Sequence, residues 1–113
     1  MKTLLLICTL FLASAAFADN ACVNVTPNGQ GNWSVRNCGS ELVIAILAQP
    51  EGESLYGSQV VLYPGQSQSV GDSTMQYKIW ACTDGRVPID DLQHSSPEWN
   101  STMVSCHRGP GSR

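Results

Sequence analysis

The chain has few charged side chains, and positive charge is the scarcer sign. Charged residues make up 13% of its 113 residues, with 6 Lys and Arg against 9 Asp and Glu. Binding to nucleic-acid phosphates needs clustered cations, so the composition argues against a nucleic-acid-binding protein. The net charge of −3 is also too small for a disordered acidic tail. The length allows one folded domain.

The spacings typical of metal ligands and activated nucleophiles are also absent. The sequence contains no Cys-x-x-Cys, no His-x-x-x-His and no Gly-x-Ser-x-Gly. We therefore expect no metal, no cofactor and no catalytic residue. Among the functions considered for this chain, the least favoured is a small hydrolase that uses Asp90, Asp91 or His94.

Long apolar runs are missing after residue 18, and the run before it is short. Met1-Lys2 supplies one positive charge, Thr3 to Leu12 is nearly all apolar, and Ala16-Phe17-Ala18 places small residues where a signal peptidase reads. A membrane span needs about 20 apolar residues. We expect residues 1–18 to be a signal peptide, and the mature protein to be secreted or periplasmic without stable membrane insertion.

Removal of the signal peptide changes the cysteine count from odd to even. Cys8 is lost, and the mature chain keeps Cys22, Cys38, Cys82 and Cys106. In an oxidising compartment four cysteines indicate two disulfides, with three connectivities to choose from. Cys22 and Cys38 lie nearly symmetrically about the turn residues 28–31, which favours Cys22–Cys38 and Cys82–Cys106. The other two connectivities stay open.

Short segments of strand character, separated by turn residues, follow one another along the mature chain. They are Cys22–Thr26, Trp33–Asn37, Leu42–Ala48, Gln59–Tyr63, Gln66–Val70, Met75–Cys82 and Trp99–Cys106. They predict an antiparallel β-sandwich of about six or seven short strands over residues 19–107, with a flexible tail at 108–113. The continuous apolar run at 42–48 is typical of a strand buried on both faces.

Residues 83–98 form the least regular segment. Within it, Pro88–Leu92 and Ser96–Glu98 each predict one short helical turn, because proline is tolerated at a first helical position.

Four stretches between residues 33 and 84 resemble the opening of thaumatin-like proteins. They are Val35-Arg-Asn-Cys38, Leu42 to Ala48, Leu62-Tyr-Pro-Gly-Gln-Ser67 and Ile79-Trp-Ala81. The sequence is equally similar to small exported bacterial proteins of unknown function that share Asn-Cys, Pro-Gly-Gln-Ser and Trp-Ala-Cys. Thaumatin-like proteins are much longer and richer in cysteine, and their acidic cleft lies in regions that this chain lacks. The resemblance implies a β-sandwich and no functional residue.

The expectation that the protein binds a ligand rests on its aromatic side chains. An exposed aromatic ring can stack on a sugar or anchor a partner protein, and Trp99 and Tyr56 are the candidates. We expect a monomeric, non-enzymatic module that binds a protein or a glycan. The alternative is a secreted inhibitor or effector that uses loops 49–58 and 83–98. Asn24, Asn32 and Asn100 begin Asn-x-Ser/Thr sequons, which matter only in a eukaryotic secretory pathway.

Overall fold

A computed structural model describes residues 21–50 and 58–108, and these residues form an all-β structure. The predicted signal peptide, residues 51–57 and residues 109–113 lie outside this part. The strands are β1 (Val23–Pro27), β2 (Trp33–Asn37), β3 (Val43–Ala48), β4 (Ser58–Leu62), β5 (Ser67–Val70), β6 (Lys78–Thr83), β7 (Arg86–Asp90) and β8 (Val104–Arg108). Within these two ranges, no helix is long and apolar enough to cross a membrane.

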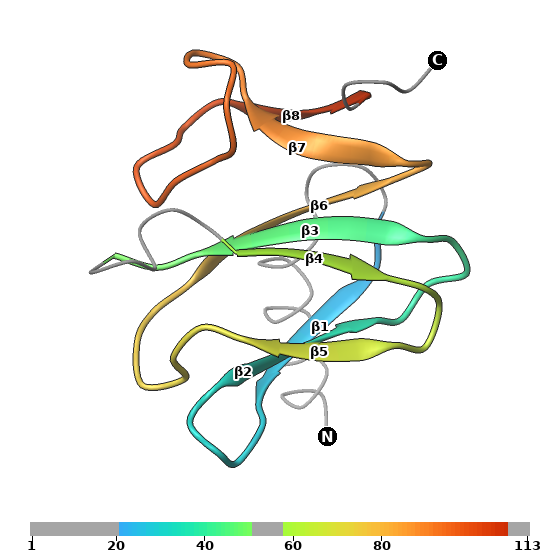
Figure 1. The fold of residues 1–113 in the computed structure, drawn as a ribbon, viewed down its shortest axis with the longest axis vertical. Coiled ribbons are helices and arrows are strands. Elements are labelled where there is room, and N and C mark those ends of the chain that lie inside the picture. Colours follow the sequence, from blue (N-terminus) through green and yellow to red (C-terminus); the bar gives the residue numbers. More distant parts are fainter. Residues whose placement is uncertain (1–20, 51–57, 109–113) are drawn as a thin grey trace, which may run out of the picture.

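The strands form three antiparallel sheets, which lie as successive layers. The first sheet has the order β1-β2-β5, the second β4-β3-β6, and the third is the two-stranded ribbon β7-β8. Figure 1 shows the second sheet between the other two. The sequence predicts a sandwich, and the ribbon covers the outer face of its second sheet.

The first hairpin is closed by a disulfide at its base. Thr26 lies opposite Ser34 and Asn24 opposite Arg36, so Cys22 comes to lie beside Cys38. The two cysteines are disulfide-bonded with their Cα atoms 5.1 Å apart. At the other end, the Asn28 side chain accepts hydrogen bonds from the Gln30 and Asn32 amides and orders the turn. The Cys22–Cys38 disulfide is the pairing that the sequence analysis favours.

Strand β3 lies at the centre of the molecule and is buried on both faces, as its continuous apolar run predicts. One face contributes Val43, Ala45 and Leu47 to the core between the first two sheets. The opposite face contributes Ile46 and Ala48 to a second, smaller core beneath the ribbon. Trp80 of β6 completes this second core and is only 5% exposed.

The ribbon replaces the helical turn predicted at Pro88–Leu92, so that prediction is wrong. The Asp91 N–H donates to the Met103 carbonyl at 2.8 Å, so alternation places the ladder hydrogen bonds of β7 at odd-numbered residues. Pro88, which has no N–H, therefore removes no hydrogen bond of the ladder. The β-branched neighbours Val87 and Ile89 favour a strand.

A two-residue turn at Asp84 and Gly85 leads from β6 into β7. Both residues have positive φ, +62° and +71°, which is the conformation that an Asp-Gly pair favours in tight turns. A second disulfide, Cys82–Cys106, with Cα atoms 5.8 Å apart, fastens β8 to β6. The ribbon is therefore held against the second sheet by a covalent bond and by the core around Trp80. This is again the favoured pair.

The end of the chain differs from the predicted pattern at three places. Residues 99 and 100 form a turn, and β8 begins only at Val104. The predicted helical turn at Ser96–Glu98 is irregular backbone. Strand β8 continues to Arg108 and so includes a residue that the sequence pattern assigns to the tail. The structure has one strand more than the seven segments that the sequence predicts. The additional strand is β7.

A buried amide fixes the segment between β5 and β6. Gln49 is 0% exposed, and its side-chain N–H groups donate to the carbonyls of Asp72 and Gln76 at 2.8 and 3.0 Å. Its oxygen accepts the Asp72 amide at 2.8 Å. Gly71 lies so close that an added Cβ would meet this oxygen at 2.7 Å. The contact explains why glycine occupies that position.

Candidate functional site

The connection between β7 and β8, residues 91–103, is organised by a buried carboxylate. Asp90 is the last residue of β7 and is 5% exposed. One of its carboxylate oxygens accepts the amides of Leu92 and Gln93 at 2.9 and 3.2 Å. The other accepts the Ser101 hydroxyl at 2.5 Å. Asp90 thus joins the two halves of this loop.

The same residue closes the first half of the loop through its backbone. The Asp90 N–H donates to the Ser95 carbonyl, and the His94 N–H donates to the Asp90 carbonyl, both at 2.7 Å. His94 adopts a φ of +57° to complete this tight turn. Most of these hydrogen bonds converge on one buried residue, and they constrain the turn. We call residues 91–96 the ribbon loop.

Two large apolar side chains of this connection are exposed, one just after β7 and one just before β8. Leu92 is 65% exposed and Met103 is 54% exposed. The Asp91 amide, one residue before Leu92, donates to the carbonyl of Met103, so the two halves of the connection lie side by side there. We call Leu92 and Met103 the apolar pair. Both side chains are exposed large hydrophobic groups.

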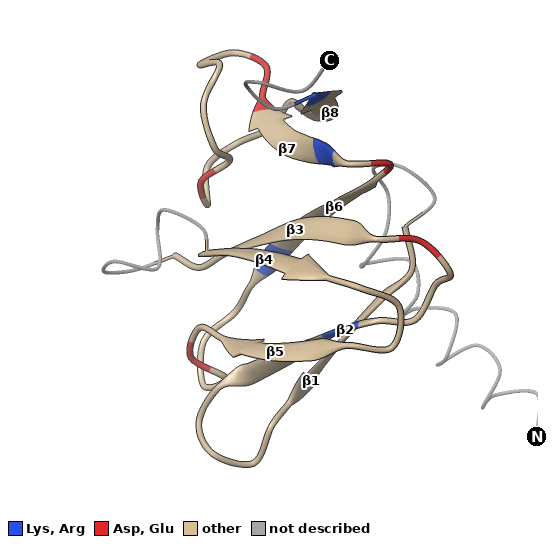
Figure 2. Ribbon diagram, turned by 45° about the vertical axis from the view of Figure 1, so that its right-hand side comes forward, with Lys and Arg blue, Asp and Glu red and all other residues tan. Residues whose placement is uncertain are grey.

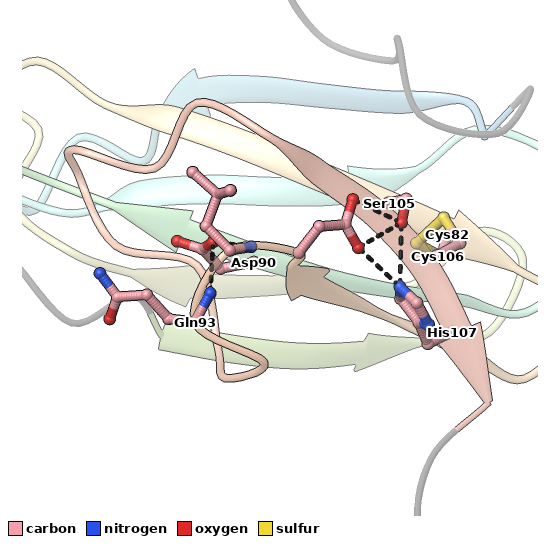
Figure 3. Close-up of polar contacts among 8 residues, drawn as sticks. Cys82, Asp90, Gln93, Ser105, Cys106 and His107 are labelled. Atoms are coloured by element: carbon pink, nitrogen blue, oxygen red, sulfur yellow. Dashed lines mark hydrogen bonds and ion pairs between the residues drawn. A yellow bond between two sulfur atoms is a disulfide. The ribbon is translucent and has the colours of Figure 1, made fainter.

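Three polar side chains, one from the connection and two from β8, contact one another (Figure 3). The Ser105 hydroxyl lies 2.8 and 2.9 Å from the two carboxylate oxygens of Asp91. The His107 Nε2 lies 2.8 Å from Asp91 Oδ1 and 2.9 Å from Ser105 Oγ. The β7–β8 register brings these residues together from 14 and 16 positions away along the chain. We call them the polar cluster.

Hydrogen bonds lower the pKa of both neighbouring carboxyl groups. The His107 ring, and then the Ser105 hydroxyl, hold the pKa of Asp91 below its ordinary value of 3.8. The Ser101 hydroxyl holds the pKa of Asp90 below the same value, with help from the Leu92 and Gln93 amides. Both groups are therefore carboxylates at neutral pH and act as hydrogen-bond acceptors.

The polar cluster contains serine, histidine and aspartate, but its geometry differs from that of an acyl-transfer triad. In such a triad the carboxylate binds one ring nitrogen and the serine hydroxyl binds the other. Here the Asp91 carboxylate and the Ser105 hydroxyl contact the same nitrogen, Nε2 of His107. The carboxylate also takes the serine hydrogen bond directly. These hydrogen bonds hold the Asp91 side chain against β8.

The hydrolase alternative names Asp90, Asp91 and His94, and the structure gives them separate roles. Asp90 faces the interior of the loop, and Asp91 faces β8. His94 is exposed in the tight turn. The contacts of Ser105 and His107 with Asp91 are not predicted from the sequence. The Asp84-Gly85 pair, a strong hairpin signal, could have revealed the strand that positions Asp91.

The aromatic candidates are placed differently from one another. Trp99 is half-buried, the Lys78 ammonium lies 4.7 Å from the centre of its ring, and the Lys78 Nζ donates to the Trp99 carbonyl at 2.7 Å. Part of its surface is thus already covered. Tyr56 and most of loop 49–58 lie outside the described residues. Tyr63, next to β4, is 60% exposed.

Among residues 21–50 and 58–108, no three His, Cys, Asp or Glu side chains are grouped so that they could hold a metal ion. The polar cluster supplies only one carboxylate and one imidazole.

No protein-family model, curated protein or solved structure matches the chain. The resemblance of residues 33–84 to thaumatin-like proteins therefore stays a prediction. Within the described residues, the candidate site rests on geometry alone: an ordered loop, an exposed apolar pair and a polar cluster that fastens the loop to β8.

Proposed function

We propose that the protein is exported and acts as a non-enzymatic binding module whose ribbon loop docks a partner protein. The observation that carries this proposal is the exposure of Leu92 in the ribbon loop and of Met103 in the second half of the same connection, whose two halves the buried Asp90 carboxylate joins. An ordered loop loses little conformational entropy on binding, so more of its contact energy contributes to affinity. The two disulfides support export, since such bonds persist in oxidising compartments.

A protein partner is favoured over a glycan by the kind of side chain that is exposed. Sugar rings stack on flat aromatic faces, whereas the Leu92 and Met103 side chains fit an apolar pocket. Trp99, the aromatic candidate of the same region, contacts Lys78 instead. The glycan alternative now depends on Tyr56 and on Tyr63.

For the inhibitor alternative, which names loops 49–58 and 83–98, a substrate-like insertion is less favoured by the shape of the ribbon loop within the second of them. A segment that enters a protease cleft in the manner of a substrate is extended. The ribbon loop is instead a closed turn, bridged between Asp90 and Ser95. Such an inhibitor would have to lose the hydrogen bonds at 2.7 Å that close this turn.

The test compares two paired variants in capture from the natural extracellular or periplasmic fraction. Wild-type protein and Val61→Ala/Tyr63→Ala, which removes exposed apolar groups near β4, should retain the same partner protein. Leu92→Ala/Met103→Ala should lose it. The partner is then purified, and loss of two buried apolar anchors should weaken its Kd by about tenfold or more. Equal retention by both variants would contradict the proposal, and release by a polysaccharide would favour the glycan alternative.

A further inference from the structure

The two methionines that follow the expected signal peptide differ in exposure. The full chain has three methionines, and Met1 belongs to the expected signal peptide. Met103, just before β8, is 54% exposed. Met75, in the segment between β5 and β6, is half-buried. Oxidation of a sulfur atom follows its accessibility, so Met103 is the more reactive of the two towards an oxidant in solution.

The remaining sulfur atoms of the described residues are already oxidised. Cys22 is disulfide-bonded to Cys38, and Cys82 to Cys106. Peroxides oxidise thiolates and thioethers, and a disulfide contains neither group. Within residues 21–50 and 58–108, the thioethers of Met75 and Met103 are therefore the sulfur atoms left for an oxidant to attack.

The Met103 side chain contributes little to the fold beneath it. Neither hydrophobic core includes this side chain. The residue supports the connection through its backbone, because its carbonyl accepts the Asp91 N–H at 2.8 Å. Oxidation of the sulfur leaves that hydrogen bond in place. A change at the sulfur therefore alters the exposed surface of the connection and leaves the packing of the sheets intact.

We propose that Met103 is an oxidation site at which a hydroperoxide weakens docking at the apolar pair. The proposal rests on the binding function proposed above, in which Met103 is one of two apolar anchors. The sulfur lone pair attacks one oxygen of the peroxide, the O–O bond breaks, and a sulfur–oxygen bond forms. The sulfur is oxidised by two electrons, and the second peroxide oxygen takes the proton and leaves as water or as an alcohol.

The charge around Met103 favours a neutral oxidant. The sequence from Asp90 to Met103 contains three carboxylates and no Lys or Arg. Figure 2 shows acidic segments at the end of β7 and along the connection to β8. Like charges repel, so this surface disfavours the approach of an anionic oxidant. Hydrogen peroxide and alkyl hydroperoxides are uncharged at neutral pH and meet no such barrier.

The product of the reaction no longer suits an apolar pocket. Methionine sulfoxide is polar, whereas the thioether is apolar and adaptable. A partner pocket that receives the Met103 thioether would have to bury the sulfoxide oxygen without a hydrogen-bond donor. The cost of such burial corresponds to a Kd about tenfold or more weaker. A bound partner covers the sulfur and should in turn slow its oxidation.

The first experiment needs no partner. The purified exported protein is treated with hydrogen peroxide, and the two methionines are followed by peptide mass spectrometry. The Met103 sulfoxide should form before the Met75 sulfoxide, and the melting temperature should change little. On a hydrophobic-interaction column the treated protein should elute earlier. Met75→Leu should show the same shift, and Met103→Leu, which keeps an apolar side chain without sulfur, should show none.

The second experiment uses the partner protein purified in the capture test. Each variant is compared with itself before and after treatment, once the peroxide has been removed. The Kd of wild-type protein and of Met75→Leu should rise by about tenfold or more on oxidation. The Kd of Met103→Leu, whatever its starting value, should not change.

Two results would overturn the regulation alone. One is oxidation of Met75 ahead of Met103 in the folded protein. The other is an unchanged Kd for protein that carries the Met103 sulfoxide, while Leu92→Ala/Met103→Ala still loses the partner. The proposed docking fails in a different way: untreated wild-type protein and Leu92→Ala/Met103→Ala would then retain the same proteins, and oxidation would have no docking to regulate.

Discussion

The Ser101 hydroxyl donates a hydrogen bond of 2.5 Å to the buried carboxylate of Asp90, which precedes it by 11 residues. The other oxygen of the same carboxylate accepts the amides of Leu92 and Gln93. The Asp90 side chain therefore supports the ribbon loop from both halves of the connection, in addition to the backbone hydrogen bonds that close the turn.

Replacement of the buried carboxylate should disorder the ribbon loop without unfolding the sheets. In Asp90→Ala the amides of Leu92 and Gln93 lose their acceptor, so their hydrogen exchange should become at least about tenfold faster. Glu98→Ala, which removes a carboxylate from the same connection, is the control. Unchanged protection of these two amides in Asp90→Ala would show that other contacts order the loop.

Acidification should weaken the fold through three carboxylates that are hydrogen-bonded in the native state. The pKa values of Asp72, Asp90 and Asp91 are lowered from 3.8, chiefly by hydrogen bonds from Thr74, Ser101 and His107 respectively. A lowered folded-state pKa contributes stability that is present above the unfolded value and is lost as the pH falls through the folded value. The melting temperature should therefore fall as the pH drops below about 4.

The contribution of Asp91 to this acid sensitivity can be isolated. In a carboxyl titration followed by NMR, the midpoint of Asp91 should lie below 3.8 in the wild-type protein and move towards 3.8 in His107→Ala. Asp90 should keep its lowered midpoint in that variant, since Ser101 is its main donor. An Asp91 midpoint that does not respond to His107→Ala would show that this ring does not stabilise the carboxylate.

The two disulfides should stabilise different parts of the molecule. Loss of either one, by Cys22→Ser/Cys38→Ser or Cys82→Ser/Cys106→Ser, should reduce the free energy of unfolding by about 2–4 kcal/mol. Only the second pair holds the ribbon over Trp80, which is 5% exposed. Its removal should therefore shift the tryptophan emission to the red below the unfolding transition. An unshifted spectrum would indicate that the apolar core alone retains the ribbon.

Gln49 should be sensitive even to a substitution of similar size. In Gln49→Leu, the Asp72 amide and the carbonyls of Asp72 and Gln76 lose a buried partner. Each buried polar group left without a partner costs about 1–3 kcal/mol. Urea denaturation should show a lower free energy of unfolding for Gln49→Leu and little change for the exposed Gln59→Leu. Equal stability of the two variants would refute this account.

Local patterns predict the part of the fold that local physics determines. The apolar run at 42–48 indicates burial on both faces. Strand β3 is buried in this way because the main core lies on one face and the ribbon covers the other. The turn at 28–31 places Cys22 beside Cys38, because a hairpin pairs residues symmetrically about its turn.

Features that depend on pairing between distant segments escape the sequence analysis. Pro88 indicates a helical turn, and the strand at this position exists because β8, beginning at Val104, pairs with it. The polar cluster depends on the same register, which joins Asp91 to Ser105 and His107. The divergence of Asp90 and Asp91, by contrast, follows from their adjacency, because neighbouring side chains point in different directions along a strand.

The most direct test of the account is the intact mass of the naturally exported protein, with and without a thiol-alkylating reagent under denaturing conditions. The account describes an exported module that two disulfides hold together, so the mass should begin at Asp19 and should not change on alkylation. Free thiols at Cys82 and Cys106 would remove the covalent support of the ribbon. A mass that still includes residues 1–18 would contradict the proposed export.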